Sequence, residues 1–138
     1  LKKLDSWLES RRRHALILDD SVRQFDGLTL PLRNDVFGHA FYKYTIQIDK
    51  ESIMSGWDRD RIIAALNGGG VPCATGICPE VYLEKAFDNT PWRPTKRLPN
   101  AVELGETSIM FLVHPTLTEA EIAKTTQVMK EVFTLAGR

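Results

Sequence analysis

The residues best suited to contact a ligand lie in one stretch near the middle of the chain, residues 68–87 (GGGVPCATGICPEVYLEKAF). Three glycines open this stretch, and a short apolar run then leads into a loop of small residues at Thr75, Gly76 and Ile77. Glycine permits backbone angles and close approaches that are closed to other residues. Ligands often bind where such a loop joins a strand to a helix. The same pattern also describes an ordinary strand-to-helix connection, and both interpretations stay open.

Familiar catalytic and metal-binding patterns are missing from the sequence. It has neither common glycine-rich phosphate loop nor a His-Glu-x-x-His segment, and its histidines, at positions 14, 39 and 114, are scattered. His39 is expected to cap a strand or lie on the surface rather than bind a ligand. Cys73 and Cys78 would need a nearby histidine to act as nucleophiles, and we expect them to be small buried apolar residues instead. Two cysteines suit neither a four-ligand zinc site nor a disulfide framework, so no metal site is predicted.

The composition is typical of one soluble globular domain with a sizeable core. The 18 basic and 18 acidic residues balance, so there is no overall field to recruit nucleic acid or an acidic membrane surface. No apolar run approaches the roughly 20 residues that span a bilayer. We expect no signal peptide before the first helix and a cytoplasmic location. The chain begins with Leu1 inside a helical pattern, which suggests a piece of a longer protein.

Hydrophobic periodicity predicts the elements that must hold the central stretch. A long helix is predicted over residues 1–24 because apolar residues recur at helical spacing, and Gly27 is typical of its end. Its basic run, residues 11–14, is interpreted as a solvated helix face rather than an anion-binding patch. A strand is predicted over residues 39–48, where alternate residues share one face of a sheet. The expected buried face consists of Ala40, Tyr42, Tyr44, Ile46 and Ile48.

A second helix is predicted over residues 59–67, with Asp58 as its N-cap. Its inner face should be formed by Ile62, Ile63 and Leu66. The apolar run at residues 71–74 is interpreted as a short strand. A short helical segment after Pro79 should present one apolar face, consisting of Val81, Tyr82, Leu83 and Phe87.

The last third of the chain is predicted to hold a loop, a helix, a strand and a helix. Residues 88–99 contain three prolines and should be a loop. Asn100 is expected to cap a helix that ends near residue 107 and buries Val102 and Leu104. The apolar run at residues 108–113 indicates a strand covered on both faces. A capping box at Thr118 and Glu121 opens a final helix to about residue 135, whose inner face is Ile122, Val128, Met129, Val132 and Phe133.

Together these elements predict an α+β fold. We expect a small, mostly antiparallel sheet of about three to four strands, with helices packed mainly on one face and a long N-terminal helix before it. Residues 1–138 would form a single domain, in which residues 1–24 are an inter-domain helix and residues 25–138 the α+β unit. On these grounds alone the function stays undetermined.

The order of these segments resembles the C-terminal third of the DegT/StrS family of sugar aminotransferases. The matching segments cover essentially the whole chain. In order they are the helix LKKLDSWLESRRRHA, the strand HAFYKYTI, Asp58-Arg59-Asp60 with Leu66, the turn Gly70-Val71-Pro72, Leu83 with Phe87, Ala101-Val102-Glu103-Leu104, and the turn from His114 to Thr118.

The resemblance implies the C-terminal small domain of an enzyme that depends on pyridoxal phosphate and has the aspartate aminotransferase fold. The parent enzyme would be a homodimer that transfers an amino group, with glutamate as donor, to a nucleotide-linked keto-sugar. Polysaccharide, lipopolysaccharide or antibiotic-sugar biosynthesis is the implied setting. In this family the Schiff-base lysine, the aspartate beside the pyridine nitrogen and the phosphate-binding residues belong to the large domain. The resemblance therefore implies no catalytic or cofactor-binding residue in this chain, which should be inactive alone.

The sequence departs from the family at positions near the substrate. Many members carry a His-Tyr pair after the Gly-Ile-Pro turn, often reaching a neighbouring subunit's active site, and here those positions are Gly76 and Ile77. A later family histidine corresponds to Tyr82, and Leu112 replaces a proline of the family's Leu-Pro-x-His-Pro turn. The residues expected to face the substrate are Tyr42, Thr75, Gly76, Ile77, Cys78 and Tyr82.

A free-standing, non-catalytic module that binds a ligand or regulates a partner is the alternative function. An exposed apolar patch around Leu1, Leu4 and Trp7 would favour the fragment, because it would mark a missing domain. A polar surface there would favour the module. A simple dimerisation domain is compatible with either.

Overall fold

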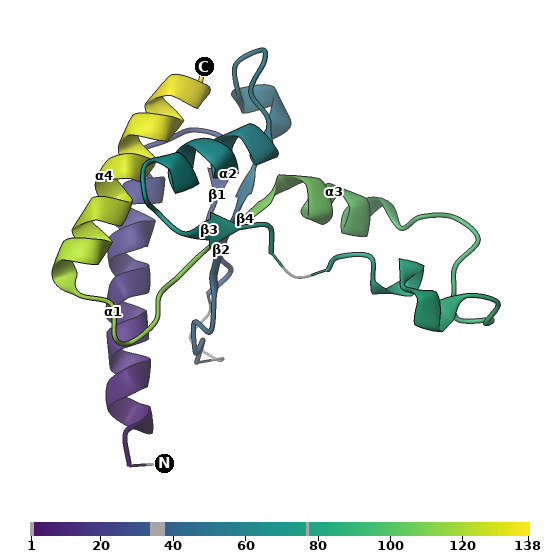
Figure 1. Cartoon of the computed structure of the whole chain (residues 1–138), viewed down its shortest axis with the longest axis horizontal. Coiled ribbons are helices and arrows are strands. Elements are labelled where there is room, and N and C mark those ends of the chain that lie inside the picture. The colour runs from purple at the N-terminus through teal and green to yellow at the C-terminus, as the bar shows by residue number, and fades with distance from the viewer. Residues whose placement is uncertain (1, 34–37, 77) are drawn as a thin grey trace.

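A four-stranded antiparallel sheet lies at the centre of the computed structural model, which describes residues 2–33, 38–76 and 78–138 (Figure 1). The strand order is β1-β2-β4-β3, and every neighbouring pair is antiparallel. The strands are β1 (Leu28–Thr29), β2 (Tyr44–Ile48), β3 (Cys73–Ala74) and β4 (Ser108–Phe111). The predicted α+β class and the mostly antiparallel sheet are thereby confirmed.

Three helices cover one face of this sheet and form the core with it. They are α1 (Leu4–Val22), α2 (Arg59–Gly68) and α4 (Glu119–Ala136), and α4 packs against both α1 and α2. The side chains of β2 alternate, so that Tyr44, Ile46 and Ile48 are buried while Thr45 and Gln47 point to the other face. The helical side of this core is built mainly from Ala15, Leu18, Val22, Ile62, Leu66, Met129 and Phe133.

The fourth helix, α3 (Pro99–Thr107), lies on the other side of the sheet, beside β2. Residues 78–98 precede it and project away from the sheet as an extended arm (Figure 1). The predicted short helix within this arm is wrong, because Val81–Leu83 and Lys85–Phe87 form two separate 3-10 turns. Val81 and Leu83 are exposed, so no packed apolar face offsets the cost of starting an α-helix there.

Of the predicted helix caps, Asp58 and the capping box at Thr118 are confirmed, whereas the predicted ends at Gly27 and Asn100 are displaced. The Asp58 side chain accepts the Arg61 N–H at 2.7 Å, as expected for an N-cap. Helix α1 ends at Val22 rather than near residue 24, and Gly27 takes a φ of +75°, which suits glycine. Helix α3 begins at Pro99 with Leu98 as N-cap, so the prediction of Asn100 as the cap is wrong. Proline fits this first position because its missing N–H would have no intrahelical partner.

The predicted strand at residues 39–48 is too long, and its first half has the wrong register. Phe41 has a φ of +45°, and its side chain is buried instead of that of Tyr42, which is 78% exposed. His39 accepts the Phe41 N–H on Nδ1 at 3.0 Å, in line with its expected capping role. This turn breaks the alternation on which the prediction rested, so the regular strand begins only at Tyr44.

The predicted coverage of β4 on both faces is wrong. Ile109 and Phe111 are buried in the core, whereas Met110 is only half-buried and Leu112 is exposed. Leu104 on α3 is also exposed, although it was expected to be buried. These residues face the side of the sheet on which α3 and the arm leave an open groove.

A buried polar cluster fixes α1 to the sheet. The Tyr44 hydroxyl donates to Asp19 Oδ1 at 2.8 Å, and Arg33 forms an ion pair with Asp19 Oδ2 at 2.6 Å. Burial and the neighbouring carboxylate raise the pKa of Tyr44. His14 is buried as well, so the expected solvated face at residues 11–14 is wrong at this position. Burial lowers the pKa of His14, which favours its neutral form.

The capping box of α4 gives a first testable prediction. Thr118 Oγ1 accepts the Glu121 N–H at 3.3 Å, and Glu121 Oε2 accepts the Thr118 N–H at 2.7 Å. Replacing Thr118 by alanine should lower the free energy of unfolding by about 1 kcal/mol, because an N–H of the first turn loses its acceptor. Urea unfolding followed by circular dichroism measures this loss. Thr118→Ser retains the hydroxyl and should cost clearly less, and equal costs for the two variants would contradict the prediction.

Candidate functional site

A groove of about 1130 Å³ runs along the face of the sheet that the three core helices do not cover. Its floor is formed by the outward-pointing residues of β2, and its walls by the loop after β3 and by α3. Its described lining consists of His39, Tyr42, Lys43, Thr45, Gln47, Arg59, Thr75, Gly76, Cys78, Pro79, Leu98, Pro99, Asn100, Ala101, Leu104, Gly105 and Ser108.

The groove brings together most of the residues that the sequence analysis expected to face the substrate. Tyr42, Thr75, Gly76 and Cys78 all line it, although Tyr42 is far from the other three in sequence. Ile77 lies outside the described residues. Tyr82 is not part of the lining, and its hydroxyl forms hydrogen bonds with Glu80 and the Leu98 N–H instead.

The two cysteines differ from their expected burial. Cys78 is exposed at the groove, with its thiol 3.6 Å from Glu84 Oε1. Cys73 is half-buried at β3, and burial raises the pKa of its thiol to about 11. The Cys73 thiolate is therefore scarce at neutral pH, and the environment does not activate it as a nucleophile.

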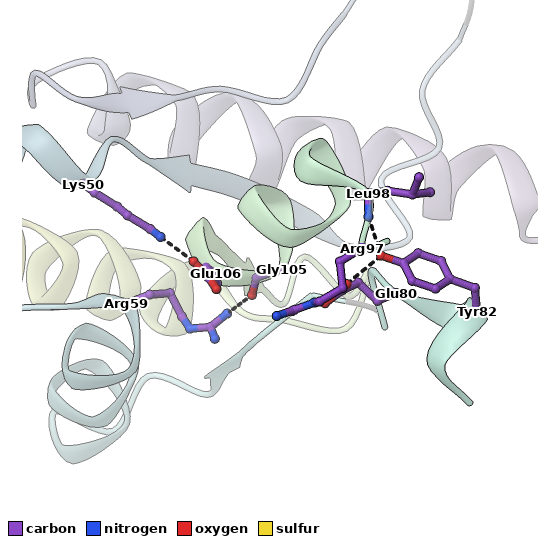
Figure 2. Close-up of polar contacts among 8 residues, drawn as sticks. All are labelled: Lys50, Arg59, Glu80, Tyr82, Arg97, Leu98, Gly105 and Glu106. Atoms are coloured by element: carbon purple, nitrogen blue, oxygen red, sulfur yellow. Dashed lines mark hydrogen bonds and ion pairs between the residues drawn. The ribbon is translucent and has the colours of Figure 1, made fainter. Parts of the chain in front are cut away.

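Arg59 fixes the wall formed by α3. Its NH1 group donates to the carbonyl of Gly105 at 2.8 Å (Figure 2). It also donates to the carbonyl of Ser108 at 3.3 Å, where α3 passes into β4. Its Nε pairs with Asp60 at 2.5 Å. On α3, Glu106 Oε2 accepts from Lys50 Nζ at 2.5 Å. Because the Arg59 guanidinium donates to the C-terminal end of α3 and pairs with Asp60, its main role is structural.

A second cluster closes the root of the arm (Figure 2). Glu80 accepts from Arg97 with both carboxylate oxygens, with a distance of 2.8 Å between Oε1 and Arg97 Nε. The Tyr82 hydroxyl donates to Glu80 Oε1 at 2.6 Å and accepts the Leu98 N–H at 2.9 Å. We call these four residues, Glu80, Tyr82, Arg97 and Leu98, the buckle. The buckle joins the first residues of the arm to its last residues.

The buckle yields a prediction about pH. The hydrogen bonds from Arg97 and Tyr82 lower the pKa of Glu80 from its ordinary value of 4.5 to about 2. Because the folded-state pKa is depressed, the contribution of the buckle should be complete above about pH 4.5 and lost as the pH falls toward 2. The ¹³C chemical shift of the Glu80 carboxyl carbon should therefore titrate near pH 2. In Arg97→Met the midpoint should rise toward 4.5, and an unchanged midpoint would contradict the assignment.

The charges of the groove favour a polar or anionic ligand over a cation. Lys43 and Arg59 line it, and no Asp or Glu does among the residues that the structure describes. Hydroxyl and amide groups of Thr45, Gln47 and Asn100 add hydrogen-bonding capacity to an otherwise apolar surface. Such a lining can bind a ligand that combines hydroxyl groups, a ring face and negative charge.

Pyridoxal phosphate, which the resemblance implies for the parent, needs more than this groove offers. The family pairs the cofactor's pyridine nitrogen with an aspartate, and the described lining has no carboxylate. Arg59 is already engaged with the end of α3. The residues of the groove therefore do not fit the cofactor by themselves.

Sequence reasoning missed several residues of this site. Thr45 and Gln47 could have been identified, because they are the polar half of the alternating pattern in β2. Glu80 and Arg97 gave no local signal, since they are 17 positions apart and meet only through the fold. Asn100 was assigned to a cap that the structure gives to Leu98.

Comparison with known proteins identifies the family. The profile described as the DegT/DnrJ/EryC1/StrS aminotransferase family matches residues 1–132. This chain belongs to that family. The match spans every helix and strand from α1 to β4 and most of α4. No curated protein matches the sequence.

Solved structures of aminotransferases share the fold of this family member. The aminotransferase from Psychrobacter cryohalolentis is 45% identical with a TM-score of 0.90, over 96% of this chain and 36% of that chain. The aminotransferase TlmJ from Streptoalloteichus hindustanus is 21% identical with a TM-score of 0.78, over 96% and 33%. A DegT DnrJ EryC1 StrS aminotransferase from Brucella abortus is 23% identical with a TM-score of 0.75, over 95% and 32%.

The chain thus spans about a third of the length of the aminotransferases that it matches. Within the described residues, none of the helices combines the length and apolar character needed to cross a membrane.

Proposed function

We propose that this chain, residues 1–138, is the C-terminal small domain of a longer aminotransferase that depends on pyridoxal phosphate. The parent transfers an amino group from glutamate to a nucleotide-linked keto-sugar, in the biosynthesis of polysaccharide, lipopolysaccharide or antibiotic sugars. It acts as a homodimer in the cytoplasm, and this domain forms one wall of the substrate cleft. The observation that carries the proposal is the family match over residues 1–132, in a chain that spans only about a third of the aminotransferases with which it shares its fold.

Two related structures support the cofactor and the substrate class. An E. coli GDP-4-keto-6-deoxy-D-mannose-3-dehydratase, 20% identical, was solved with bound hydrated pyridoxal phosphate. A GDP-4-keto-6-deoxymannose-3-dehydratase, 19% identical, was solved as an H188N mutant with bound GDP-perosamine. At this identity the likeness shows the fold alone, so cofactor and substrate remain part of the proposal.

The exposed apolar surface of α1 supports the division into domains. Leu4 and Trp7 lie on the same helix face as the buried Ala15 and Leu18, but they are exposed, Trp7 at 48%. Figure 1 shows the first turns of α1 extending beyond the N-terminal end of α4. A large domain packed on these turns would remove this apolar surface from water. Leu1, the third residue of the expected patch, lies outside the described residues.

The groove supports the role of a cleft wall. It offers ring, hydroxyl and amide contacts from Tyr42, Thr45, Thr75 and Asn100, and it carries the cation Lys43. A sugar attached to a nucleotide presents hydroxyl groups, a base and a negatively charged diphosphate, which match this mixture of groups. Tyr42, Thr75, Gly76 and Cys78 are therefore proposed to face the substrate. For Ile77, which lies outside the described residues, and for Tyr82, this proposal rests on the resemblance alone.

The coding frame upstream of Leu1 tests the division into domains. The proposal expects a continuous frame that encodes about twice this length of chain, because the chain covers 36% of its 45% identical relative. This upstream part should contain the lysine that holds the cofactor. A stop codon followed by a start codon directly before Leu1 would contradict the proposal and favour a self-contained binding module.

A further inference from the structure

The arm at residues 78–98 connects β3 to α3, and residues near its two ends meet at Glu80 and Arg97. It follows the loop after β3 and ends at the N-terminus of α3, whose other end leads into β4. Between its two ends the arm projects outward (Figure 1), and near its middle Trp92 is 74% exposed. Because the outer part of the arm is not packed on the core, contacts at its root must determine how its two ends are spaced.

The buckle supplies those contacts through one carboxylate. Both oxygens of Glu80 accept from Arg97, and Oε1 also accepts from the Tyr82 hydroxyl. Tyr82 passes the connection on by accepting the Leu98 N–H, at the N-cap of α3. The Glu80 side chain is only 11% exposed, whereas that of Arg97 is 57% exposed. A carboxylate that is shielded and accepts from several donors holds its partners in one geometry.

Both walls of the groove continue directly into the buckle. Cys78 and Pro79 line the groove on the departing side, and Leu98 and Pro99 line it on the returning side. The two sides also touch at a second point, since a Cβ atom on Gly105 would lie 2.5 Å from Pro79 Cγ. A side chain at Gly105 would displace Pro79, so the loop after β3 packs directly on α3 at this point.

We propose that Glu80 is a positioning residue, which sets the width of the groove by holding the loop after β3 against the N-terminus of α3. This inference rests on the proposed function for its catalytic consequence. Glu80 itself does not line the groove. Its loss should therefore weaken binding of the keto-sugar nucleotide without affecting the reaction with the amino donor.

The test uses the full-length parent protein with its cofactor. In Glu80→Gln the KM for the keto-sugar nucleotide should rise about tenfold, as expected when a group acts on substrate binding. The rate of the half-reaction with glutamate should stay within about twofold of the wild type. The exchanged pair Glu80→Arg with Arg97→Glu should restore part of the lost affinity. An unchanged KM in Glu80→Gln, or an equal loss in both half-reactions, would overturn the proposal.

Glu106→Gln is the matched control. It also breaks an ion pair on the same side of the sheet, that with Lys50 (Figure 2), but neither partner lines the groove. The KM of this control should remain at the wild-type value. A rise equal to that in Glu80→Gln would show that any lost ion pair near α3 has the same effect, and it would contradict a special role for Glu80.

Hydrogen exchange separates failure of this inference from failure of the proposed function. The Leu98 amide donates to Tyr82, so it should exchange at least about tenfold faster in Tyr82→Phe and in Glu80→Gln than in the wild type. This measurement needs no turnover. If the wild-type parent transfers no amino group, the proposed function fails, while faster exchange of the Leu98 amide in the variants still supports the role of the buckle in holding the N-terminus of α3. If exchange at Leu98 is unchanged in both variants, that role of the buckle is refuted.

Discussion

The isolated 138-residue chain, mixed with pyridoxal phosphate, glutamate and a keto-sugar nucleotide, is expected to form no 2-oxoglutarate above the rate of the free cofactor. Transfer by such enzymes requires that the protein bind, orient and tune the cofactor. The described lining of the groove offers Lys43 but no carboxylate. The full-length parent should exceed the isolated chain by at least about 10⁶-fold, the lower end of typical enzymatic accelerations.

A coupled assay for 2-oxoglutarate measures both proteins under the same conditions. Circular dichroism should first show that the isolated chain is folded, so that its inactivity is informative. Lys43→Ala serves as a control, because Lys43 is the lysine among the described residues of the groove. Turnover by the isolated chain that Lys43→Ala abolishes would contradict the assignment of the cofactor site to the rest of the parent.

Replacing Asp19 by alanine is expected to cause the largest loss of stability among the polar residues of the fold. Asp19 is 1% exposed and interacts with both Tyr44 and Arg33. Its removal leaves a buried hydroxyl and a largely buried guanidinium without their acceptor, which should cost about 3 kcal/mol. Because the free energy of unfolding of such domains is only about 5–15 kcal/mol, the melting temperature of the variant should be far below that of the wild type.

Tyr44→Phe is the matched control for this cluster. It removes the hydroxyl but leaves the ion pair between Asp19 and Arg33, so it should cost only about 1 kcal/mol. Urea unfolding of both variants, followed by circular dichroism, gives the two losses. A smaller loss for Asp19→Ala than for Tyr44→Phe would show that the carboxylate is not the centre of the cluster.

The parts of the fold that depend on local signals were predictable from the sequence. The Asp58 cap and the capping box at Thr118 and Glu121 form as expected, because their partners lie three residues away. The buried face of α4 also follows from helical spacing, since Ile122, Val128, Met129, Val132 and Phe133 are all buried. Nothing beyond the neighbouring turns is needed to determine these features.

The errors arise where tertiary contacts override the local pattern. Phe41 is buried because its positive φ turns the chain before β2, and a search for alternating residues has no means of detecting that turn. The apolar run around Met110 indicated burial on both faces, yet one face borders the groove. An apolar surface left open in this way is indistinguishable in sequence from one that is covered.

The candidate site was predictable only where its residues lie close together in the sequence. Thr75, Gly76 and Cys78 follow a glycine-rich turn that is visible in the sequence, whereas the strand pattern placed Tyr42 in the core and only the resemblance suggested that it faces the substrate. The buckle between Glu80 and Arg97 was not predictable, since its two halves meet across the whole length of the arm. Family resemblance located the loop, and only the structure shows what holds it.

The most direct test of the central claim is the transfer of ¹⁵N from labelled glutamate to a nucleotide-linked keto-sugar by the purified full-length parent. Mass spectrometry of the sugar nucleotide reports the result without assuming which carbon is aminated. The account predicts an amino sugar nucleotide that carries the ¹⁵N label, together with an equal amount of 2-oxoglutarate. A folded, cofactor-loaded parent that releases no labelled product with any of a panel of keto-sugar nucleotides would contradict it.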